Sequence, residues 1–242
     1  MRLGRHGLWL AGAMMGWLTL TLWLDRAGGG GDVWRQRGLG LATWLVLLAV
    51  LAQCTPLVRA QTLVVVVVAT LVELTFSPLL EVYLYRFHNV PAYVPPGHGL
   101  VYLSAWALGH WPPLRRHLRA AAAVVTVALG VWATYGWLLA PRHDGLGFFW
   151  FLCLLGFLVW GPSRPVYVGA AVVVTWLELT GTHLGNWAWQ PHDPILGVTV
   201  GNPPSGAAGG YGWFDLAGLL LAPWLVRLVS PRPREPQDAD VS

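Results

Sequence analysis

Two glutamates inside apolar segments are the residues of this chain best placed to do chemistry. Glu73 lies in the segment 72–75 (Val-Glu-Leu-Thr) and Glu178 in the segment 177–180 (Leu-Glu-Leu-Thr), and each segment follows a run of β-branched residues. A carboxyl group that an apolar setting keeps neutral can donate a proton. The pair therefore predicts acid–base chemistry on a lipid-soluble substrate. A hydrogen bond between helices through a protonated carboxyl group is the alternative interpretation.

Other titratable residues near these segments extend the candidate catalytic set. It comprises Glu178, Glu73, His98, His183 and Asp215. Glu178 is expected to be the first acid and Glu73 a second acid or the base. His98 is the best candidate proton carrier in the first half, since an imidazole group can gain and lose a proton in the physiological pH range. Asp215 lies in the last apolar segment, and we expect it to pair with His183 or Asn202.

No metal or cofactor is expected in this chain. The candidate acids and histidines show none of the helical His and Glu spacings that are typical of metal sites. Motifs for nucleotide, haem or flavin binding are also absent from the sequence.

Each glutamate is followed by a segment rich in proline, glycine, asparagine and aromatic residues. Such segments cannot continue a helix, and irregular backbone at membrane depth survives only inside protein or along a cavity. We therefore predict that both segments fold back over the helices as lids or re-entrant segments. Exposed loops with aromatic residues at the membrane interface are the alternative. The predicted substrate-binding residues are Trp187, Trp189, Asn186, Asn202, Tyr102 and Tyr211.

The composition places these residues in a membrane protein. Of 242 residues, 55% are hydrophobic and 11% are charged, whereas a soluble domain carries about 25% charged residues. The mean hydropathy is +0.53. This composition excludes a disordered chain and a disulfide scaffold. The net charge of +4 comes from arginines in loops and at the termini, so it does not point to nucleic acid. The predicted fold class is all-α, a polytopic bundle of transmembrane helices.

About eight segments have the composition of membrane spans, which need about 20 apolar residues each. They are residues 8–24, 38–55, 60–81, 98–111, 119–140, 146–161, 165–181 and 206–229. With eight spans, ten of the 15 arginines fall on the side that holds both termini. The positive-inside rule then predicts a multi-pass protein of the cell inner (plasma) membrane with both termini cytoplasmic.

The glutamate segments belong to a repeat. Downstream of each comes a second matched element, residues 95–97 (Pro-Pro-Gly) in the first half and residues 203–206 (Pro-Pro-Ser-Gly) in the second. An even number of spans per copy predicts two parallel copies related by an axis along the membrane normal. The expected units are residues 1–113 and residues 114–230, each with four helices, followed by a disordered cytoplasmic tail at residues 231–242. Chance similarity between apolar stretches is the alternative.

The repeat also fixes the depth of the two acids. Each lies 13 residues past the start of its span, at Ala60 and at Pro165. At about 1.5 Å per residue, each carboxyl group lies about 20 Å from the cytoplasmic face, still inside the apolar slab. An acid at that depth costs several kcal/mol unless it is protonated, paired or facing water.

The stretch from Glu178 to Gly206 resembles membrane carotenoid-modifying proteins, namely the lycopene-cyclase-domain proteins and the carotenoid hydratases related to them. The resemblance rests on Glu178, the turn 185–189 (Gly-Asn-Trp-Ala-Trp), Pro191, residues 196–197 (Leu-Gly), Gly201 and residues 203–204 (Pro-Pro). In the cyclases a paired acidic motif follows that proline, whereas this chain has Ser205 and Gly206. The resemblance therefore favours a hydratase-like or otherwise repurposed member.

These observations predict an integral membrane protein that acts on an isoprenoid or carotenoid-type lipid. A proton added to an isoprenoid double bond makes a tertiary carbocation, which hydration, cyclisation or proton loss can quench. Aromatic walls stabilise such cations. The activity would be that of a lyase or an isomerase, and the expected partner is a membrane lipid or isoprenoid substrate.

The alternative is a non-catalytic membrane protein: a proton-coupled or lipid transporter, or a subunit of a larger complex. Homo- or hetero-oligomerisation in the membrane stays open. A closed pocket that opens sideways to lipid favours an enzyme, whereas a path to both aqueous faces favours transport.

Overall fold

The structure, a computed structural model, describes residues 3–229 and is mostly helical. The tail predicted at 231–242 lies outside the described residues. The helices are α1 (Leu3–Leu24), α2 (Val33–Ala52), α3 (Pro56–Leu74), α4 (Val94–Gly109), α5 (Pro112–Arg116), α6 (Leu118–Leu138), α7 (Gly145–Trp160), α8 (Arg164–His183) and α9 (Ala207–Val229). A π-helical turn, η1 (Thr75–Leu79), extends α3. Two short strands are β1 (Tyr83–Tyr85) and β2 (Trp187–Trp189).

The helices begin and end where local chemistry dictates. Thr55 caps α3, with Pro56 at its first position, and the Asp144 carboxylate caps α7 by accepting from the Gly147 amide. The turn after α1 contains Gly28 and Gly30, whose φ angles of 74° and 64° favour glycine.

Six helices of the described chain are long and apolar enough to cross a membrane: α1, α2, α3 with η1, α6, α8 and α9. The other two predicted spans correspond to α4 and α7, each 16 residues long, which is shorter than the usual span of about 20 residues. The protein is therefore a multi-pass helical membrane protein. The predicted boundary between halves, at residue 113, falls inside the short helix α5.

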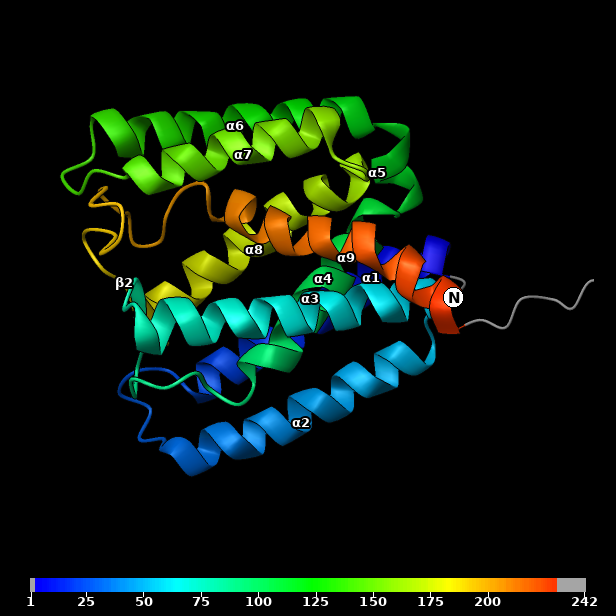
Figure 1. Ribbon diagram of the computed structural model, residues 1–242, viewed down its shortest axis with the longest axis horizontal. Helices are drawn as coiled ribbons and strands as arrows, with labels where there is room; N and C mark the ends of the chain where they lie inside the picture. The colour runs from blue at the N-terminus through cyan, green and yellow to red at the C-terminus, as the bar shows by residue number, and fades with distance from the viewer. Residues whose placement is uncertain (1–2, 230–242) are drawn as a thin grey trace, which may run out of the picture.

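Four helices form the centre of the bundle (Figure 1). α3 packs along α9 and α4 packs along α8, while α1 covers α4 and α7 covers α9. Glycines set the closeness of the two central crossings. A Cβ on Gly169 would collide with the backbone of Ala105, and a Cβ on Gly218 would crowd Gln61. Small residues at these points let the backbones approach, as is common between membrane helices.

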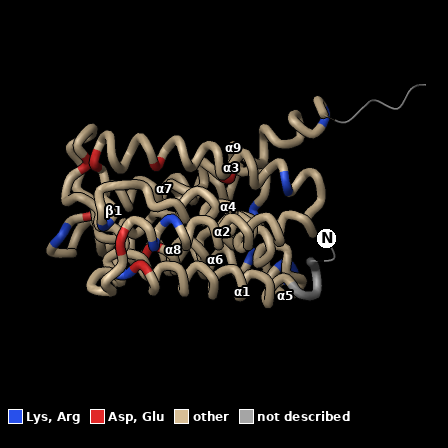
Figure 2. Tube along the Cα trace, turned by 90° about the horizontal axis from the view of Figure 1, so that it is seen from below, with Lys and Arg blue, Asp and Glu red and all other residues tan. Residues whose placement is uncertain are grey.

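The two ends of the bundle differ. α1 begins and α9 ends at one end, and β1 and β2 lie at the opposite end (Figure 1). Charged residues gather toward both ends of the molecule, with few between them (Figure 2). This distribution is what an apolar slab around the middle of the bundle requires.

The segments that follow the two glutamates form a small sheet. β1 and β2 pair antiparallel, with Tyr83 opposite Trp189, Leu84 opposite Ala188 and Tyr85 opposite Trp187. In each strand the first and third residues are buried, so four aromatic side chains share the inner face. The sequence analysis expected irregular segments here and did not predict this pairing, because it joins residues about 100 positions apart.

Candidate functional site

The Glu73 carboxyl group is buried near the end of α3 and has three short hydrogen bonds. Its Oε2 accepts from the hydroxyl groups of Tyr83 and Tyr85, each at 2.8 Å. Its Oε1 lies 2.8 Å from Nε2 of His98, whose imidazole is also buried. Both carboxyl oxygens are therefore fully engaged, and one partner is a group that can carry positive charge.

The two tyrosines lie in β1, outside the candidate spans. Burial raises the pKa of both phenols well above the ordinary value, and the nearby Glu73 carboxylate adds to the effect. Their hydroxyl groups therefore stay protonated and remain donors to Glu73.

The Glu178 carboxyl group is buried in α8 and has a different set of partners. Its Oε2 accepts from the indole Nε1 atoms of Trp187 and Trp189, at 3.0 Å and 3.1 Å. Its Oε1 is 3.4 Å from the hydroxyl group of Tyr211. All three donors are neutral. Within residues 3–229, Oε1 has only this one long contact, so it is the least engaged of the four oxygens of Glu73 and Glu178.

The two carboxyl environments correspond element by element. In each, one oxygen accepts from the first and third residues of the strand that follows, β1 or β2. The other oxygen faces the fifth residue of the next helix along the chain, which is His98 in α4 and Tyr211 in α9. The difference lies in donor chemistry: phenols and an imidazole around Glu73, indoles and a phenol around Glu178.

Both carboxyl groups line one cavity of about 450 Å³. Its walls are mostly apolar and aromatic side chains, which is typical of a ligand pocket in this size range. The ring centroids of His98 and Tyr211 are 5.3 Å apart, and Phe214 packs edge-on against His98. The third partners of the two glutamates thus lie next to each other in the wall of the cavity.

The cavity has an open side and a closed end. Among the described lining residues, the exposed ones are Phe149 of α7, Trp213 of α9, and Ile195 and Leu196 of the segment after β2, with exposed fractions of 53% to 66%. All four are apolar. On the α1 side, Leu18 and Leu22 are 4% and 3% exposed. The cavity therefore opens between α7, α9 and this segment and ends blindly against α1.

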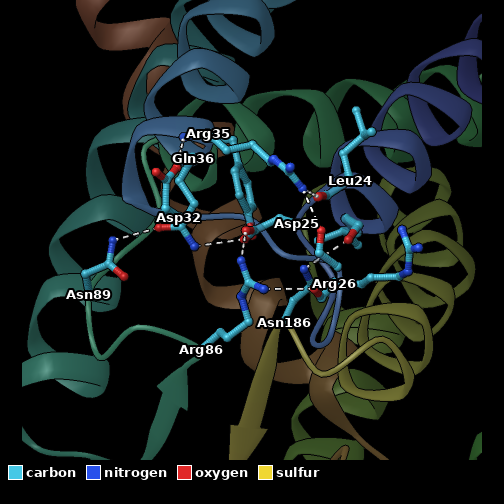
Figure 3. A network of polar contacts seen from close by, with 12 residues as sticks. Leu24, Asp25, Arg26, Asp32, Arg35, Gln36, Arg86, Asn89 and Asn186 are labelled. Carbon is cyan, nitrogen blue, oxygen red and sulfur yellow. Dashed lines mark hydrogen bonds and ion pairs between the residues drawn. The ribbon is translucent and has the colours of Figure 1, made fainter.

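A polar network covers the end of the cavity beside β1 (Figure 3). Asp25, which is fully buried, pairs with Arg86 at 2.8 Å and accepts from Tyr93 at 2.7 Å and from Gln36 at 2.8 Å. Asn186 donates to the Leu22 carbonyl at 3.1 Å. Because Leu22 and Tyr93 also line the cavity, this network ties both loops and α2 over that end.

A second anchor holds the long segment between β2 and α9. The Asp144 carboxylate accepts from the amides of Gly147, Gly201 and Ser205 and from the Ser205 hydroxyl. Arg142 donates to the carbonyls of Trp189, Gln190 and Val200. This segment is therefore a fixed wall of the cavity. Sequence reasoning missed Asp144, Arg142, Asp25 and the donor role of Tyr83 and Tyr85. The only signal was the presence of acids beside predicted helix ends.

The structure brings together six of the predicted site residues: Glu178, Glu73, His98, Trp187, Trp189 and Tyr211 all line the cavity. The others lie elsewhere. Asn186 and Asn202 hold the loops in place: Asn186 donates to the Leu22 carbonyl, and Asn202 accepts from the Trp189 amide. The Tyr102 hydroxyl donates to Gln61 at 3.0 Å. His183 is exposed in a groove between α1 and α8.

Asp215 is buried in α9, one turn past Tyr211, and does not line the cavity. The expected pairing with His183 or Asn202 does not form, because α9 turns this side chain toward Tyr102 and Tyr167 instead. Its Oδ2 has no hydrogen-bond partner among residues 3–229.

Within the described residues, no three His, Cys, Asp or Glu side chains are grouped as a metal site would need. The potential metal ligands that line the cavity are Glu73, His98, Glu178 and Asp193. Glu73 accepts from two phenols, Glu178 from two indoles and Asp193 from two backbone amides.

No protein-family model, curated protein or solved structure matches this chain. The class of the protein therefore rests on its own architecture: a multi-pass helical membrane protein whose central helices enclose two buried carboxyl groups in one apolar cavity.

Proposed function

We propose that this protein is a membrane enzyme that protonates a double bond of an isoprenoid lipid of the carotenoid type. One observation carries the proposal: the buried carboxyl groups of Glu73 and Glu178 line a single cavity whose exposed lining residues, in the described chain, are all apolar. A pocket of this kind admits a substrate from the lipid phase and excludes bulk water from the acids.

Glu178 is the acid in this proposal. Its Oε1 has only the 3.4 Å contact with Tyr211, so a proton there faces the cavity. When the proton moves to a double-bond carbon, the carboxyl O–H bond breaks, a C–H bond forms and a tertiary carbocation remains. The Trp187 and Trp189 indoles then donate to the new carboxylate at Oε2, and their aromatic faces stabilise the cation.

The pair of Glu73 and His98 is the base. A neutral imidazole beside a carboxylate takes up one proton and becomes an ion pair, which their 2.8 Å contact stabilises. That proton comes from the water that adds to the cation, giving a tertiary alcohol, or from the neighbouring carbon, giving a shifted double bond. If an internal alkene attacks instead, a ring forms before the proton is lost. Returning the proton to Glu178, past the adjoining His98 and Tyr211 rings, completes the cycle.

The proposal includes a topology of eight crossings built from two four-helix copies. The matched partners of Glu73 and Glu178, the matched packing of α3 on α9 and α8 on α4, and the location of both described chain ends at one end of the bundle support it. Of the two short helices, α4 is buried along most of its length, and α7 packs against α6, α8 and α9. The arginine distribution supports a further part of the proposal, cytoplasmic termini with the cavity toward the outer face of the plasma membrane.

A proton-coupled lipid transporter is the second candidate, and Asp215 favours it. This buried acid lies one turn past Tyr211, away from the β-strand end, with an unpartnered Oδ2. It extends the series of acids beyond the cavity, as a proton path across the membrane requires. If the protein is a transporter, Asp215→Asn should abolish proton-driven movement of lipid across vesicle membranes. If it is an enzyme, wild-type protein in detergent, without vesicles, should alter the lipid chemically.

The proposed function is tested with lycopene, an acyclic isoprenoid polyene, in detergent solution made with D₂O. Wild-type protein should place deuterium on carbon and yield an alcohol, isomer or cyclised product that mass spectrometry detects. Glu178→Gln should lower turnover by about 10³-fold. The exposed Glu81→Gln is the matched control and should leave turnover unchanged. Equal turnover in Glu178→Gln and wild type would reject the acid role.

A further inference from the structure

The open side of the cavity has an apolar turn at its rim. Residues 194–198 (Pro-Ile-Leu-Gly-Val) lie within a short hairpin in which His192 pairs with Thr199. Ile195, Leu196 and Val198 are 56%, 66% and 36% exposed, and the first two line the cavity. Exposed apolar side chains grouped in this way mark a surface that contacts a membrane or another protein.

The backbone of this turn supplies its own hydrogen bonds. The Asp193 carboxylate accepts from the amides of Ile195 and Leu196, at 2.9 Å and 2.7 Å. The Asp193 carbonyl accepts from the Gly197 amide and the Asp193 amide donates to the Val198 carbonyl, each at 2.8 Å. The proline in between has no amide hydrogen. Every amide donor from Asp193 to Gly197 therefore has an acceptor inside the turn, which is what backbone needs in order to leave water.

The hairpin is fixed beside the start of α7. The Thr199 hydroxyl group accepts from the Gly145 amide at 3.1 Å, and the Thr199 carbonyl accepts from the Leu146 amide at 2.9 Å. Figure 1 shows the segment between β2 and α9 running along this end of α7. Phe149 of α7 and Trp213 of α9, both exposed, line the same cavity as the turn. The apolar turn therefore continues the exposed apolar surface of these two helices.

The charge distribution around the turn favours lipid as its partner. The sequence has no charged residue from Pro194 to Phe214, which includes the turn and the start of α9. The carboxylate of Asp193 is buried and engaged by the turn itself. A protein interface carries a polar rim around its apolar core, whereas a surface that continues a membrane-spanning helix into lipid is apolar throughout.

We infer that residues 194–198 form a membrane-insertion loop, whose amides Asp193 satisfies and whose Ile195, Leu196 and Val198 side chains contact lipid acyl chains. The leaflet concerned is the one on the β-strand side of the bundle. The inference goes beyond the proposed chemistry, because it depends only on the membrane-spanning architecture. With the loop in lipid, the adjoining opening of the cavity faces acyl chains rather than water.

Nitroxide labels on full-length protein in phosphatidylcholine liposomes measure whether the loop lies in lipid. The label is attached to Leu196→Cys in a chain that also carries Cys54→Ala and Cys153→Ala. Oxygen concentrates among acyl chains, and a nickel chelate stays in water. Collisions with oxygen should dominate for Leu196→Cys, as for Leu220→Cys on the exposed side of α9. Collisions with the nickel chelate should dominate for Ala27→Cys, in the exposed turn after α1.

Variants of Asp193 test the part that the satisfied backbone plays. Asp193→Ala leaves the amides of Ile195 and Leu196 without their acceptor. An amide without a partner is costly in an apolar phase, so the loop should move toward water and the Leu196 label should collide more with the nickel chelate. Asp193→Asn keeps a side-chain oxygen that accepts hydrogen bonds, and the label should stay in lipid.

Dominant collisions with the nickel chelate at Leu196→Cys would overturn the inference, because the loop would then lie in water. Low accessibility to both reagents would also overturn it, because a second copy or another protein would then cover the loop. An unchanged ratio in Asp193→Ala would reject the role of Asp193. If Leu196→Cys does not fold, Ile195→Cys provides the same measurement. The measurement needs no turnover, so a failure of the proposed acid chemistry leaves its outcome unchanged.

Discussion

The Glu73 and Glu178 environments share one geometry and differ in chemistry. Both carboxyl groups receive two aromatic donors from a strand and one partner from the fifth residue of the next helix. That partner is an imidazole at 2.8 Å for Glu73 and a phenol at 3.4 Å for Glu178. A group that can become cationic, with two short phenol hydrogen bonds, favours a charged carboxylate. Around Glu178 burial favours the protonated form, and two ordinary indole hydrogen bonds with one long phenol contact oppose it less.

The comparison shows how a repeated scaffold can yield an acid and a base from identical residues. Two carboxyl groups in one apolar cavity must hold different protonation states to act in sequence. Here the strand and helix positions are retained and only the donor types change. Exchanging or deleting those donors therefore tests whether they set the different protonation states of the two glutamates.

The largest expected effect on stability is that of His98→Phe. This change removes the imidazole hydrogen bond to the buried Glu73 carboxylate and leaves it with phenol donors alone. The loss of a hydrogen bond to a charged group costs about 1.5–3 kcal/mol. Tyr211→Phe removes only a 3.4 Å contact and should cost about 1 kcal/mol or less. Chemical unfolding in detergent measures both. Equal losses in the two variants would mean that the two environments carry the same charge.

A smaller difference is expected from the strand donors. Tyr85→Phe removes a hydrogen bond to a charged carboxylate and should cost about 1.5–3 kcal/mol, whereas Trp187→Phe removes one to a neutral carboxyl group and should cost about 0.5–1.5 kcal/mol, apart from the change in packed volume. Trp160→Phe, on the exposed surface, controls for loss of an indole. A reversed order in the unfolding free energies would contradict the assignment of charge.

The smallest expected effect is a dependence on alkaline pH to which the strand donors of Glu73 contribute and the strand donors of Glu178 do not, because phenols titrate and indoles do not. Burial raises the pKa of Tyr83 and Tyr85 in the folded state. Below the ordinary tyrosine pKa of about 10 both states hold the proton and stability is full. As the pH rises past that value the unfolded chain ionises first, so folding stability falls. Unfolding midpoints between neutral and alkaline pH should fall less in Tyr83→Phe than in wild type, and Trp187→Phe should follow wild type. If the unfolding midpoint falls with pH as steeply in Tyr83→Phe as in wild type, ionisation of these phenols does not cause the fall.

Much of the architecture follows from sequence because it depends on local patterns. Apolar length and proline or glycine breakers locate the long helices, and Glu73 and Glu178 stand out as acids in apolar runs. The repeated segment around each acid also indicates that the two environments are related.

The rest depends on contacts between distant residues. Tyr83 and Tyr85 become donors only because β1 pairs with β2 and turns their side chains inward. Asp25 and Asp144 are buried in networks whose other members lie far along the chain. Asp215 was expected to meet His183, but the side of α9 that packs inward depends on how α9 crosses α3 and α8, which residue spacing does not specify.

The central claim is that Glu178 holds a proton while Glu73 holds a charge, and infrared spectroscopy of the protein in detergent tests it most directly. A protonated carboxyl group has a carbonyl stretch well separated from that of a carboxylate. Near neutral pH, Glu178→Gln should remove one such band and Glu73→Gln should remove none, with Asp215→Asn recorded to assign the remaining buried acid. Loss of the band in Glu73→Gln and its persistence in Glu178→Gln would contradict the account.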